Sequence, residues 1–273
     1  MSNPGGRSTK FPLGMDRLSP ATDSSVAARA REPLRPQRPL HDAARDATRR
    51  TAPSGLGMDS AQVRQRMVAR LRAGGLRSEP LAEAMRLVPR HLFVDSALAT
   101  QAYEDTSLPI GHGQTISKPS VVARMIDLLF DSAQSRNSGH LGRTLEIGTG
   151  CGYQTALLAQ LSRRLVSIER LRPLYDKACV NLADWRPAHV RLLHGDGMLG
   201  HASAAPFDSI IAAAGGDELP EAWLAQLAVG GRLVAPMLRG RGQVLVVVDR
   251  HERGCVHSEH EAVHFVPLKS GVV

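Results

Sequence analysis

Three glycines alternate with other residues directly after a short apolar segment that contains Glu146 and Ile147: Gly148, Gly150 and Gly152. The segment before them predicts a buried strand, and the residues after them predict a helix. Glycine allows positive φ and lets the backbone approach a ligand closely. Ligands in open α/β sheets bind at the carboxyl ends of such strands. The motif therefore predicts a cofactor site, although a tight strand-to-helix turn without a ligand would use the same glycines.

The spacing of these glycines separates two classes of cofactor. A dinucleotide fingerprint, G-x-G-x-x-G, would place its third glycine at position 153, which is a tyrosine in this chain. The observed pattern, E-x-G-x-G-x-G, resembles the first motif of Rossmann-like methyltransferases that use S-adenosyl-L-methionine (AdoMet). AdoMet has no pyrophosphate for a helix amino terminus to bind, but it carries a cationic sulfonium and an ammonium group. We expect Glu146 to add negative charge near that cationic end.

Two further strand ends carry residues that suit a nucleoside. Glu169 ends the next predicted strand, about 20 residues beyond the glycines, where a carboxylate can accept hydrogen bonds from both ribose hydroxyls. Asp196 and Gly197 follow the third predicted strand. In the methyltransferase pattern the Asp side chain faces the adenine amino group, and the next backbone N–H faces the ring. Each feature alone also fits a solvated carboxylate or a turn, but their order along the chain favours AdoMet and its product S-adenosyl-L-homocysteine.

The loop before the first strand of the sheet carries the most specific pattern, Thr115-Ile116-Ser117-Lys118-Pro119. With this loop, the chain from about residue 60 to residue 269 closely resembles the protein-L-isoaspartate O-methyltransferase family. The other shared motifs are Val88-Pro89-Arg90 followed by Phe93, Leu145 to Gly150, Gly195-Asp196-Gly197, Ala205 to Asp208, Gly230 to Leu233, and Phe265-Val266-Pro267-Leu268. Many methyltransferases share the glycine motif, whereas the loop combined with the terminal Val-Pro-Leu is far more specific.

The resemblance implies a reaction and the residues that carry it. The methyl group of AdoMet would be transferred to the free α-carboxylate of an L-isoaspartyl residue, and the ester would cyclise to a succinimide that initiates repair. Ser117 matches the active-site serine of the family, and Thr115, Ile116 and the segment Val266-Pro267-Leu268 would hold the substrate backbone. Isoaspartyl-containing proteins and peptides are the implied partners.

A carboxylate acceptor explains why this chemistry requires no general base. Its pKa of roughly 4 leaves it ionised at neutral pH. The enzyme needs to exclude water, align the carboxylate with the sulfonium and satisfy the oxygen that does not attack. The hydroxyl of Ser117 suits this role as an orienting donor, although a serine before Pro119 also fits a loop or helix cap. Cys151 stands where the family commonly has Ser, and Lys269 where some members have a hydroxyl residue, so both roles are open.

The elements that must position these residues alternate along the chain from residue 143. This alternation predicts an α/β fold with a Rossmann-like, doubly wound and mostly parallel sheet. The expected strands are 144–147, 165–168, 190–193, 209–213 and 232–235, and the expected helices are 153–161, 173–185 and 220–227. Two final strands, 243–249 and 262–266, are joined too closely for a crossover helix and are expected to be antiparallel. Additional helices are expected amino-terminal to the sheet, with 105–118 as an irregular loop and 132–142 as a polar connector.

The first 58 residues differ in composition from the rest. They contain seven of the 17 prolines and ten Lys/Arg against five Asp/Glu, so most of the net charge of +8 lies there. Such a segment buries too little apolar surface to offset its ordering entropy. We therefore expect a disordered basic tail over residues 1–58 and one methyltransferase domain over residues 59–273. Three interpretations of this segment remain open: a dispensable tail, a basic arm that contacts nucleic acid or another acidic partner, or an organelle transit peptide.

Composition argues against several other kinds of protein. No apolar run approaches the roughly 20 residues that span a bilayer, and the cysteines Cys151, Cys179 and Cys255 show no C-x-x-C spacing. We expect a cytoplasmic monomer without a membrane partner, a disulfide framework or structural zinc. His257, His260 and His264 lack nearby carboxylates of clear geometry, so we expect exposed histidines there and no metal.

Two other functions compete with the repair enzyme. A nucleic-acid methyltransferase would fit the basic tail, but amino-group methylases usually carry a Pro-Pro-aromatic motif after the fourth strand, where this chain has Ser209 to Gly215. Nucleic acid is therefore not an expected partner. A binding module that keeps the fold without catalysis is the other possibility. The presence of Ser117, Glu169 and Asp196 argues against it, and failure to bind AdoMet would support it.

Overall fold

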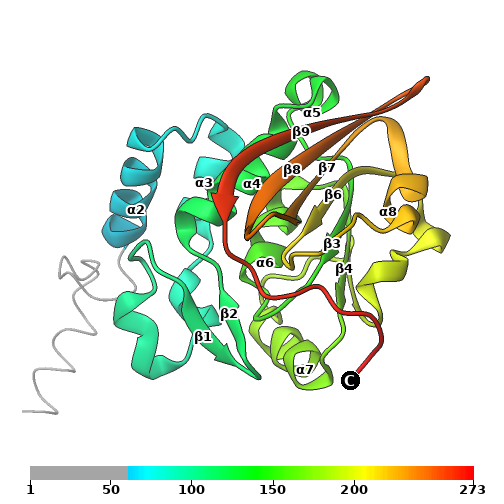
Figure 1. Cartoon of the computed structure of the whole chain (residues 1–273). Helices are drawn as coiled ribbons and strands as arrows, with labels where there is room; N and C mark the ends of the chain where they lie inside the picture. Colours follow the sequence, from blue (N-terminus) through cyan, green and yellow to red (C-terminus); the bar gives the residue numbers. More distant parts are fainter. Residues whose placement is uncertain (1–60) are drawn as a thin grey trace, which may run out of the picture. The chain divides into compact units, whose positions relative to one another are not determined.

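The computed structural model describes residues 61–273, so the tail expected over residues 1–58 lies outside the described residues. A seven-stranded sheet with the order β5-β4-β3-β6-β7-β8-β9 forms the centre of the described part (Figure 1). The strands are β3 (Arg143–Ile147), β4 (Arg164–Glu169), β5 (Val190–His194), β6 (Phe207–Ala212), β7 (Leu227–Arg239), β8 (Gly242–His251) and β9 (Gly254–Val263). Pairing is parallel from β5 through β7 and antiparallel for β8 and β9. The predicted Rossmann-like α/β fold with antiparallel strands near the carboxyl terminus is confirmed.

The strand order places a crevice beside β3. The chain runs from β3 to β4 on one side and returns to β6 on the other side, so the direction of strand addition reverses at β3. Ligands of open α/β sheets bind outside the carboxyl ends of the strands at such a reversal. The Glu146 motif ends β3 and Glu169 ends β4, so this topology brings together two of the motifs that the sequence singled out.

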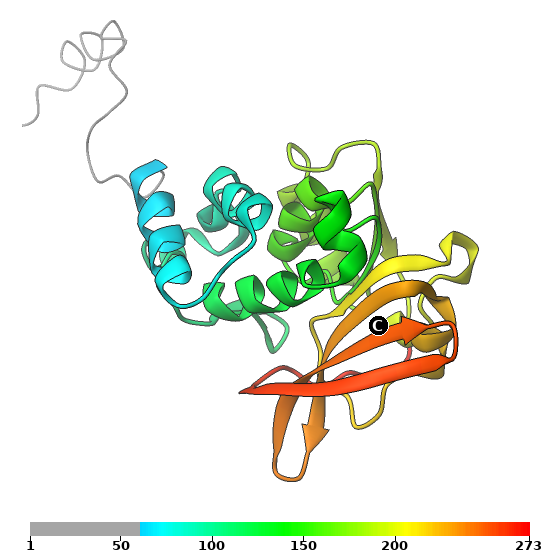
Figure 2. The same ribbon diagram turned by 90° about the horizontal axis from the view of Figure 1, so that it is seen from above.

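Helices cover the sheet, and four of those within the described residues precede its first strand along the chain. They are α2 (Ala61–Ala73), α3 (Glu79–Leu87), α4 (Pro119–Phe130), α5 (Ala133–Ser138), α6 (Tyr153–Leu161), α7 (Arg172–Asn181) and α8 (Glu221–Gln226). Figure 2 shows the cyan and green helices gathered on one side and the orange and red carboxyl-terminal strands on the other. None of the helices in the described part of the chain has the length and apolarity to cross a membrane.

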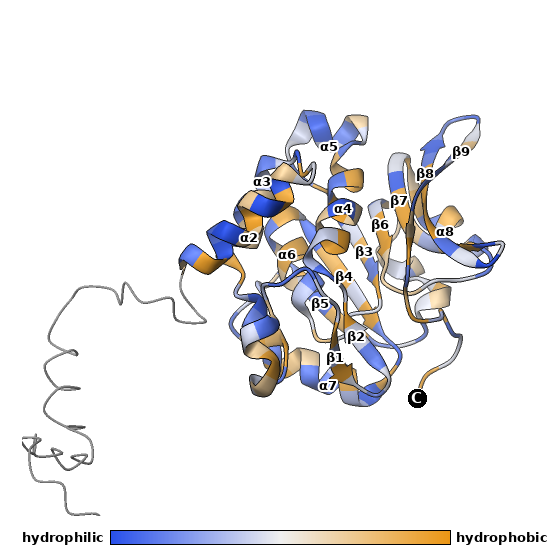
Figure 3. Ribbon diagram, turned by 60° about the vertical axis from the view of Figure 1, so that its left-hand side comes forward, coloured by the Kyte–Doolittle hydropathy of each residue, from blue (hydrophilic) through white to orange (hydrophobic). Residues whose placement is uncertain are grey.

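Two apolar clusters hold this arrangement together. The larger cluster joins the amino-terminal helices, α6 and α7 to one face of the sheet, and the smaller one packs Trp223 of α8 against the other face. Figure 3 shows hydrophobic colour concentrated on the strands in the middle of the sheet, whereas hydrophilic and hydrophobic residues alternate along α2. Aliphatic side chains such as Leu145, Ile210 and Leu233 are fully buried. Burial of this apolar surface is the main contribution that stabilises the fold.

Three expectations about irregular segments were wrong. Residues 105–118 contain an antiparallel hairpin of β1 (Leu108–Gly111) and β2 (Gln114–Ile116), whose short strands carry too few residues for a clear alternation. The connector 132–142 contains α5, whose first turn is capped by the side chain of Ser132. The last strand is β9 rather than 262–266. It is an exposed edge strand, so its polar sequence shows none of the alternation that reveals half-buried strands.

Candidate active site

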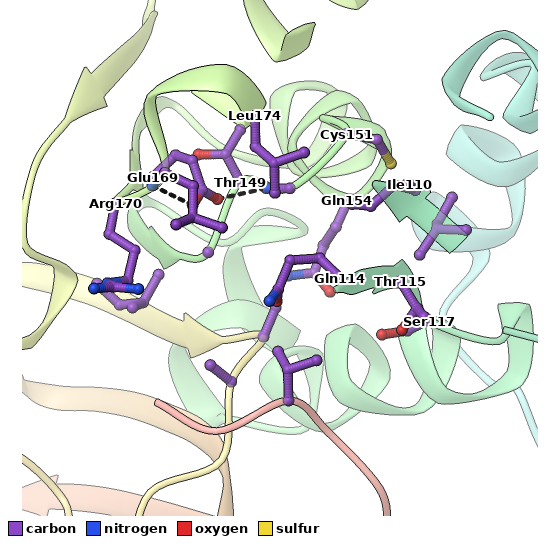
Figure 4. Close-up of a pocket in the computed structure, with 18 of the residues that line it drawn as sticks. Ile110, Gln114, Thr115, Ser117, Thr149, Cys151, Gln154, Glu169, Arg170 and Leu174 are labelled. Carbon is purple, nitrogen blue, oxygen red and sulfur yellow. Dashed lines mark hydrogen bonds between the residues drawn. The ribbon is translucent and has the colours of Figure 1, made fainter. Parts of the chain in front are cut away.

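A cavity of about 450 Å³ opens at the carboxyl ends of β3 and β4. Its walls come from the β1–β2 hairpin, the glycine turn after β3, the end of β4 and the carboxyl-terminal segment 266–269 (Figure 4). The volume lies within the range of about 300–1,000 Å³ typical of small-molecule sites. The residues that the sequence predicted and that line this cavity are Thr115, Ile116, Ser117, Gly148, Gly150, Glu169, Gly197, Val266, Pro267 and Leu268. The expected Glu146, Gly152 and Asp196 do not line it.

The backbone conformation of the turn after β3 requires glycine at particular positions. Gly152 has φ 93° and begins α6, and a Cβ at this position would lie 2.9 Å from Leu182 Cδ1. Gly148 has φ 90° and passes close to Ala213 of the neighbouring strand end. Side chains other than hydrogen are strained at such φ values. Gly152 therefore shapes the turn from outside the cavity, while Gly148 forms part of the wall itself.

Glu169 joins the glycine turn to the start of α7. Its Oε2 accepts a hydrogen bond of 2.9 Å from Gly150 N, and its Oε1 accepts one of 2.9 Å from Leu171 N (Figure 4). The side chain is nearly buried but lines the cavity. An ionised carboxylate offers about four acceptor positions, so these two bonds leave room for two further donors. This is the chemistry that a pair of ribose hydroxyls requires.

Glu146 lies behind the glycine turn and is fully buried. Its carboxylate accepts hydrogen bonds from Gln154 Nε2 at 3.0 Å, Thr155 Oγ1 at 2.6 Å and Ser167 Oγ at 2.7 Å. Burial raises the pKa of Glu146 to about 7, although these three donors oppose the shift. Ser167 Oγ also lies 2.6 Å from Thr149 Oγ1, and Thr149 lines the cavity. Glu146 thus supports the turn from behind rather than forming the wall, where the motif predicts it.

Asp196 and Gly197 follow β5, but only Gly197 lines the cavity. The Asp196 carboxylate caps the turn that follows, since Oδ1 accepts from Met198 N at 2.9 Å, while Oδ2 accepts from Gly271 N at 2.6 Å. Gly197 reaches the cavity wall, and a Cβ at this position would lie only 2.5 Å from Ile147 Cγ2. The Asp-Gly pair therefore brings backbone against the end of β3 where a side chain does not fit.

The carboxyl-terminal segment forms a further wall of the cavity. Gly215 N donates to Val266 O at 2.8 Å, and Leu268 N donates to Gly215 O at 2.7 Å, so the segment runs beside the end of β6 like a short strand. Lys269, whose role the sequence left open, also lines the cavity. His257 and His260 lie on exposed β9, and no group of residues within 61–273 has the composition and proximity of a metal site.

Ser117 directly follows β2 and is half-buried on the cavity wall. Its backbone carbonyl accepts a 2.7 Å hydrogen bond from Arg90 Nη2, and Arg90 Nε donates to Ala102 O at 2.8 Å. The guanidinium carbon of Arg90 lies 4.8 Å from the centre of the Tyr153 ring, which also lines the cavity. The sequence analysis used Arg90 only as part of a family motif. No charge pattern along the chain indicated that this arginine would be buried against the Ser117 loop.

The geometry suits a reaction between two bound molecules. Glu169 offers acceptors for a sugar at one part of the wall, and the Ser117 hydroxyl and the 266–268 backbone offer contacts for a second molecule at another. Apolar residues including Ile116, Val122 and Leu174 also line the cavity. A largely apolar site excludes water and strengthens the electrostatic interactions inside it.

The chain is similar in sequence to a known family of enzymes. The family model for protein-L-isoaspartate(D-aspartate) O-methyltransferase matches residues 62–273. A protein-L-isoaspartate O-methyltransferase from Methylibium petroleiphilum is 62% identical over 96% of both chains. One from Leptothrix cholodnii is 56% identical over 97% of this chain and 95% of its own.

Solved structures give the same fold. A protein-L-isoaspartate O-methyltransferase structure superposes with a TM-score of 0.68 at 26% identity and covers 77% of this chain and 67% of its own. A Plasmodium falciparum structure in complex with S-adenosyl-L-homocysteine has a TM-score of 0.65 at 23% identity, covering 76% of this chain and 98% of its own. At that identity the second likeness supports the fold alone.

Proposed function

The chain belongs to the protein-L-isoaspartate(D-aspartate) O-methyltransferase family, and we propose that its reaction takes place in the cavity between Glu169 and Ser117. It transfers a methyl group from AdoMet to the free α-carboxylate of L-isoaspartyl residues in damaged proteins, which initiates repair through a succinimide. The observation that carries the assignment of the site is the meeting of the glycine turn, the Ser117 loop and residues 266–268 around one cavity.

The cofactor end of the cavity is formed by the strand ends. AdoMet supplies a methyl group that is electrophilic because it is bonded to a sulfonium. We propose that Glu169 accepts hydrogen bonds from the ribose hydroxyls, since it has two acceptor positions left, and that the backbone of Gly148 and Gly150 lies against the cofactor. Gly197 would contact the adenine ring. Asp196, which the sequence analysis assigned to the adenine amino group, does not line the cavity, so we propose that its hydrogen bonds to Met198 N and Gly271 N hold the turn that carries Gly197.

Two residues of the motif are proposed to act on the cofactor indirectly. Gly152 permits the conformation that starts α6, because the Cβ of any other residue at this position would collide with Leu182. Glu146 holds Ser167, and Ser167 holds Thr149 on the cavity wall. A support of this kind fixes the turn in the geometry that the cofactor requires, because residues behind a site lock the ones that touch the ligand.

The acceptor end is formed by the hairpin and the carboxyl-terminal segment. We propose that the Ser117 hydroxyl donates to the oxygen of the isoaspartyl carboxylate that does not attack the methyl group. Thr115, Ile116, Val266, Pro267 and Leu268 would hold the substrate backbone on either side. The carboxylate is ionised at neutral pH, so alignment and exclusion of water are sufficient for the transfer and no base needs to remove a proton.

The experiment that tests this site uses tritiated AdoMet with matched isoaspartyl and aspartyl peptides. Base-labile methyl groups are expected on the isoaspartyl peptide alone. Ser117→Ala should lower turnover roughly tenfold or more, since a hydrogen bond to a charged group contributes about 1.5–3 kcal/mol, while the Arg90 contact to the Ser117 carbonyl is kept. The control is Ser107→Ala, an exposed serine outside the cavity. Unchanged turnover in Ser117→Ala would remove the hydroxyl from the mechanism.

We further propose a cytoplasmic monomer whose methyltransferase domain spans residues 59–273 and has no nucleic-acid partner. One chain supplies every wall of the described cavity, and Cys151, Cys179 and Cys255 are all free thiols, as suits a reducing compartment. Light scattering should give the mass of one chain. Removal of residues 1–58 should leave kcat/KM for the isoaspartyl peptide unchanged, whereas a fall of several-fold would assign the tail a part in substrate binding.

A further inference from the structure

Arg90 is a fully buried cation without a carboxylate partner. Its side chain has 0% relative exposure, and none of the ion pairs among residues 61–273 includes it. The guanidinium contacts the carbonyls of Ala102 and Ser117 and the face of Tyr153. Its third nitrogen, Nη1, is buried and has no hydrogen-bond partner among the described residues.

This environment is unfavourable for a charge. Removing a guanidinium from water is costly, and carbonyl oxygens and an aromatic face compensate for that cost less than a carboxylate does. Burial lowers the pKa of Arg90 below its ordinary value. Arginine nevertheless stays protonated in proteins, so the charge remains in place. Among residues 61–273, Asp105 is the one carboxylate whose charge favours the Arg90 cation, but it forms no ion pair with Arg90 and its exposed carboxylate already accepts two hydrogen bonds from Ser120.

The position of this charge relates it to the acceptor end of the cavity. Ser117 and Tyr153 both line the cavity, and Arg90 lies directly behind them. The acceptor in the reaction is an anion, the free α-carboxylate of the isoaspartyl residue. Inside a protein the effective dielectric constant is well below that of water, so a charge one side chain behind a wall still acts strongly on a charge in front of it.

We propose that Arg90 is a positioning residue for the isoaspartyl substrate: its positive charge favours the free α-carboxylate at the acceptor end, and its hydrogen bond to the Ser117 carbonyl fixes the loop that holds that carboxylate. This inference rests on the proposed function of the cavity. The substrate carboxylate then supplies the negative charge that the protein itself does not place beside Arg90. The charge and the loop contact have separable consequences, because only the charge distinguishes a carboxylate from a neutral group of the same shape.

The test compares two peptides that differ only at the reacting group. One is an isoaspartyl peptide with its free α-carboxylate, and the other is its α-carboxamide analogue. Their dissociation constants are measured by calorimetry on full-length enzyme saturated with S-adenosyl-L-homocysteine. Wild type is expected to prefer the carboxylate, and Arg90→Gln should reduce that preference about tenfold because Gln keeps an amide donor but carries no charge. Arg90→Lys should keep most of the preference.

The outcomes separate this proposal from a structural role and from the proposed function. If Arg90→Gln weakens both peptides equally, Arg90 serves only to hold the loop and the proposal is overturned. Affinity for S-adenosyl-L-homocysteine should stay within about twofold in both variants, which shows that the fold and cofactor end are intact. If wild type methylates aspartyl and isoaspartyl peptides alike, the proposed function fails, independently of Arg90.

A second test of the role of Arg90 uses the wild-type enzyme, so it does not depend on the folding of a variant. The α-carboxyl carbon of the isoaspartyl peptide is labelled with ¹³C, and its chemical shift is followed against pH in the complex with S-adenosyl-L-homocysteine. The proposal expects the pKa of the bound carboxyl to be lower than that of the free peptide, because a nearby cation favours the ionised form. An unchanged or raised pKa of the bound carboxyl would overturn it.

Discussion

The backbone N–H of Gly150 donates a 2.9 Å hydrogen bond to Oε2 of Glu169. Glu169 ends β4, and Gly150 lies in the turn after β3, so one carboxylate at the cavity wall joins two neighbouring strand ends. The residue proposed for the ribose hydroxyls therefore also fixes the glycine turn against which the cofactor would lie. Loss of its charge should affect both roles together.

Glu169→Gln should weaken binding of S-adenosyl-L-homocysteine at least tenfold. The amide NH₂ would face one of the N–H donors of Gly150 and Leu171, and it would no longer accept from a ribose hydroxyl. Hydrogen bonds to charged groups contribute about 1.5–3 kcal/mol each. Calorimetry checks the affinity, with Glu252→Gln in an exposed turn as the matched control. Equal affinity in the two variants would contradict the assignment of Glu169.

Gly197→Ala should weaken cofactor binding about tenfold and destabilise the fold by roughly 1–3 kcal/mol. The added methyl group would lie 2.5 Å from Ile147 Cγ2, and Ile147 lines the cavity, so the wall must shift. Gly242→Ala is the control because open space surrounds its Cβ position. Urea unfolding and calorimetry on both variants measure the two effects. A Gly197→Ala variant as stable and as tight-binding as Gly242→Ala would show that the turn is not closely packed.

The stability of the protein should fall with rising pH through the titration of Glu146. Its folded-state pKa of about 7 lies above the ordinary value of 4.5, so between these values the folded protein holds a proton that the unfolded chain has lost. The free energy of unfolding therefore decreases as pH rises from about 4.5 to 7 and then levels off. At about 1.4 kcal/mol for each pH unit, Glu146 should contribute a decrease of ~2–3 kcal/mol between pH 5 and pH 7.5.

Glu146→Gln provides the comparison for this pH dependence, because glutamine occupies the same volume and does not titrate. Urea unfolding of both proteins at pH 5 and pH 7.5 gives the two changes in the free energy of unfolding. The change should be smaller in the variant by the contribution of Glu146. Parallel pH profiles for the two proteins would mean that the buried carboxyl does not titrate in this range.

Cys151 should react with iodoacetamide at least tenfold more slowly than Cys255. Cys151 is 3% exposed, and burial raises the pKa of its thiol, whereas Cys255 is exposed on β9. The thiolate is the reactive form, so both effects slow the reaction. Mass spectrometry of peptides after timed labelling at pH 8 measures the two rates. Because Cys151 lines the cavity, S-adenosyl-L-homocysteine should slow its labelling further but leave Cys255 unchanged. Equal rates would show that the cavity wall opens freely.

Most of the sheet could be predicted because its central strands are buried. The apolar segments around Leu145, Ile168 and Ile210 have the length of strands and alternate with helical segments, and this alternation implies a parallel sheet. Exposed β9 and the short hairpin β1–β2 were missed for the opposite reason. These strands are held by hydrogen bonds to a neighbouring strand. Their own side chains show little alternation between apolar and polar residues.

The site was predictable where the backbone dictates the residue type. Gly148 and Gly197 lie where a larger side chain is strained or collides, and such positions leave a mark in the sequence. The placement of Glu146 behind the turn was not predictable. A carboxylate near the carboxyl end of a strand points to one face of the sheet or the other, and only the positions of Thr155 and Ser167 show that it faces the interior. The burial of Arg90 depends in the same way on contacts between distant segments.

A crystal structure of the enzyme with S-adenosyl-L-homocysteine and an isoaspartyl peptide tests the assignment of the cavity most directly. We predict that the ribose hydroxyls lie within hydrogen-bond distance of the Glu169 carboxylate. The free α-carboxylate of the peptide should face the sulfur of the product within reach of the Ser117 hydroxyl. A complex in which the two ligands occupy separate places, or in which the peptide carboxylate lies away from Ser117, would contradict the account.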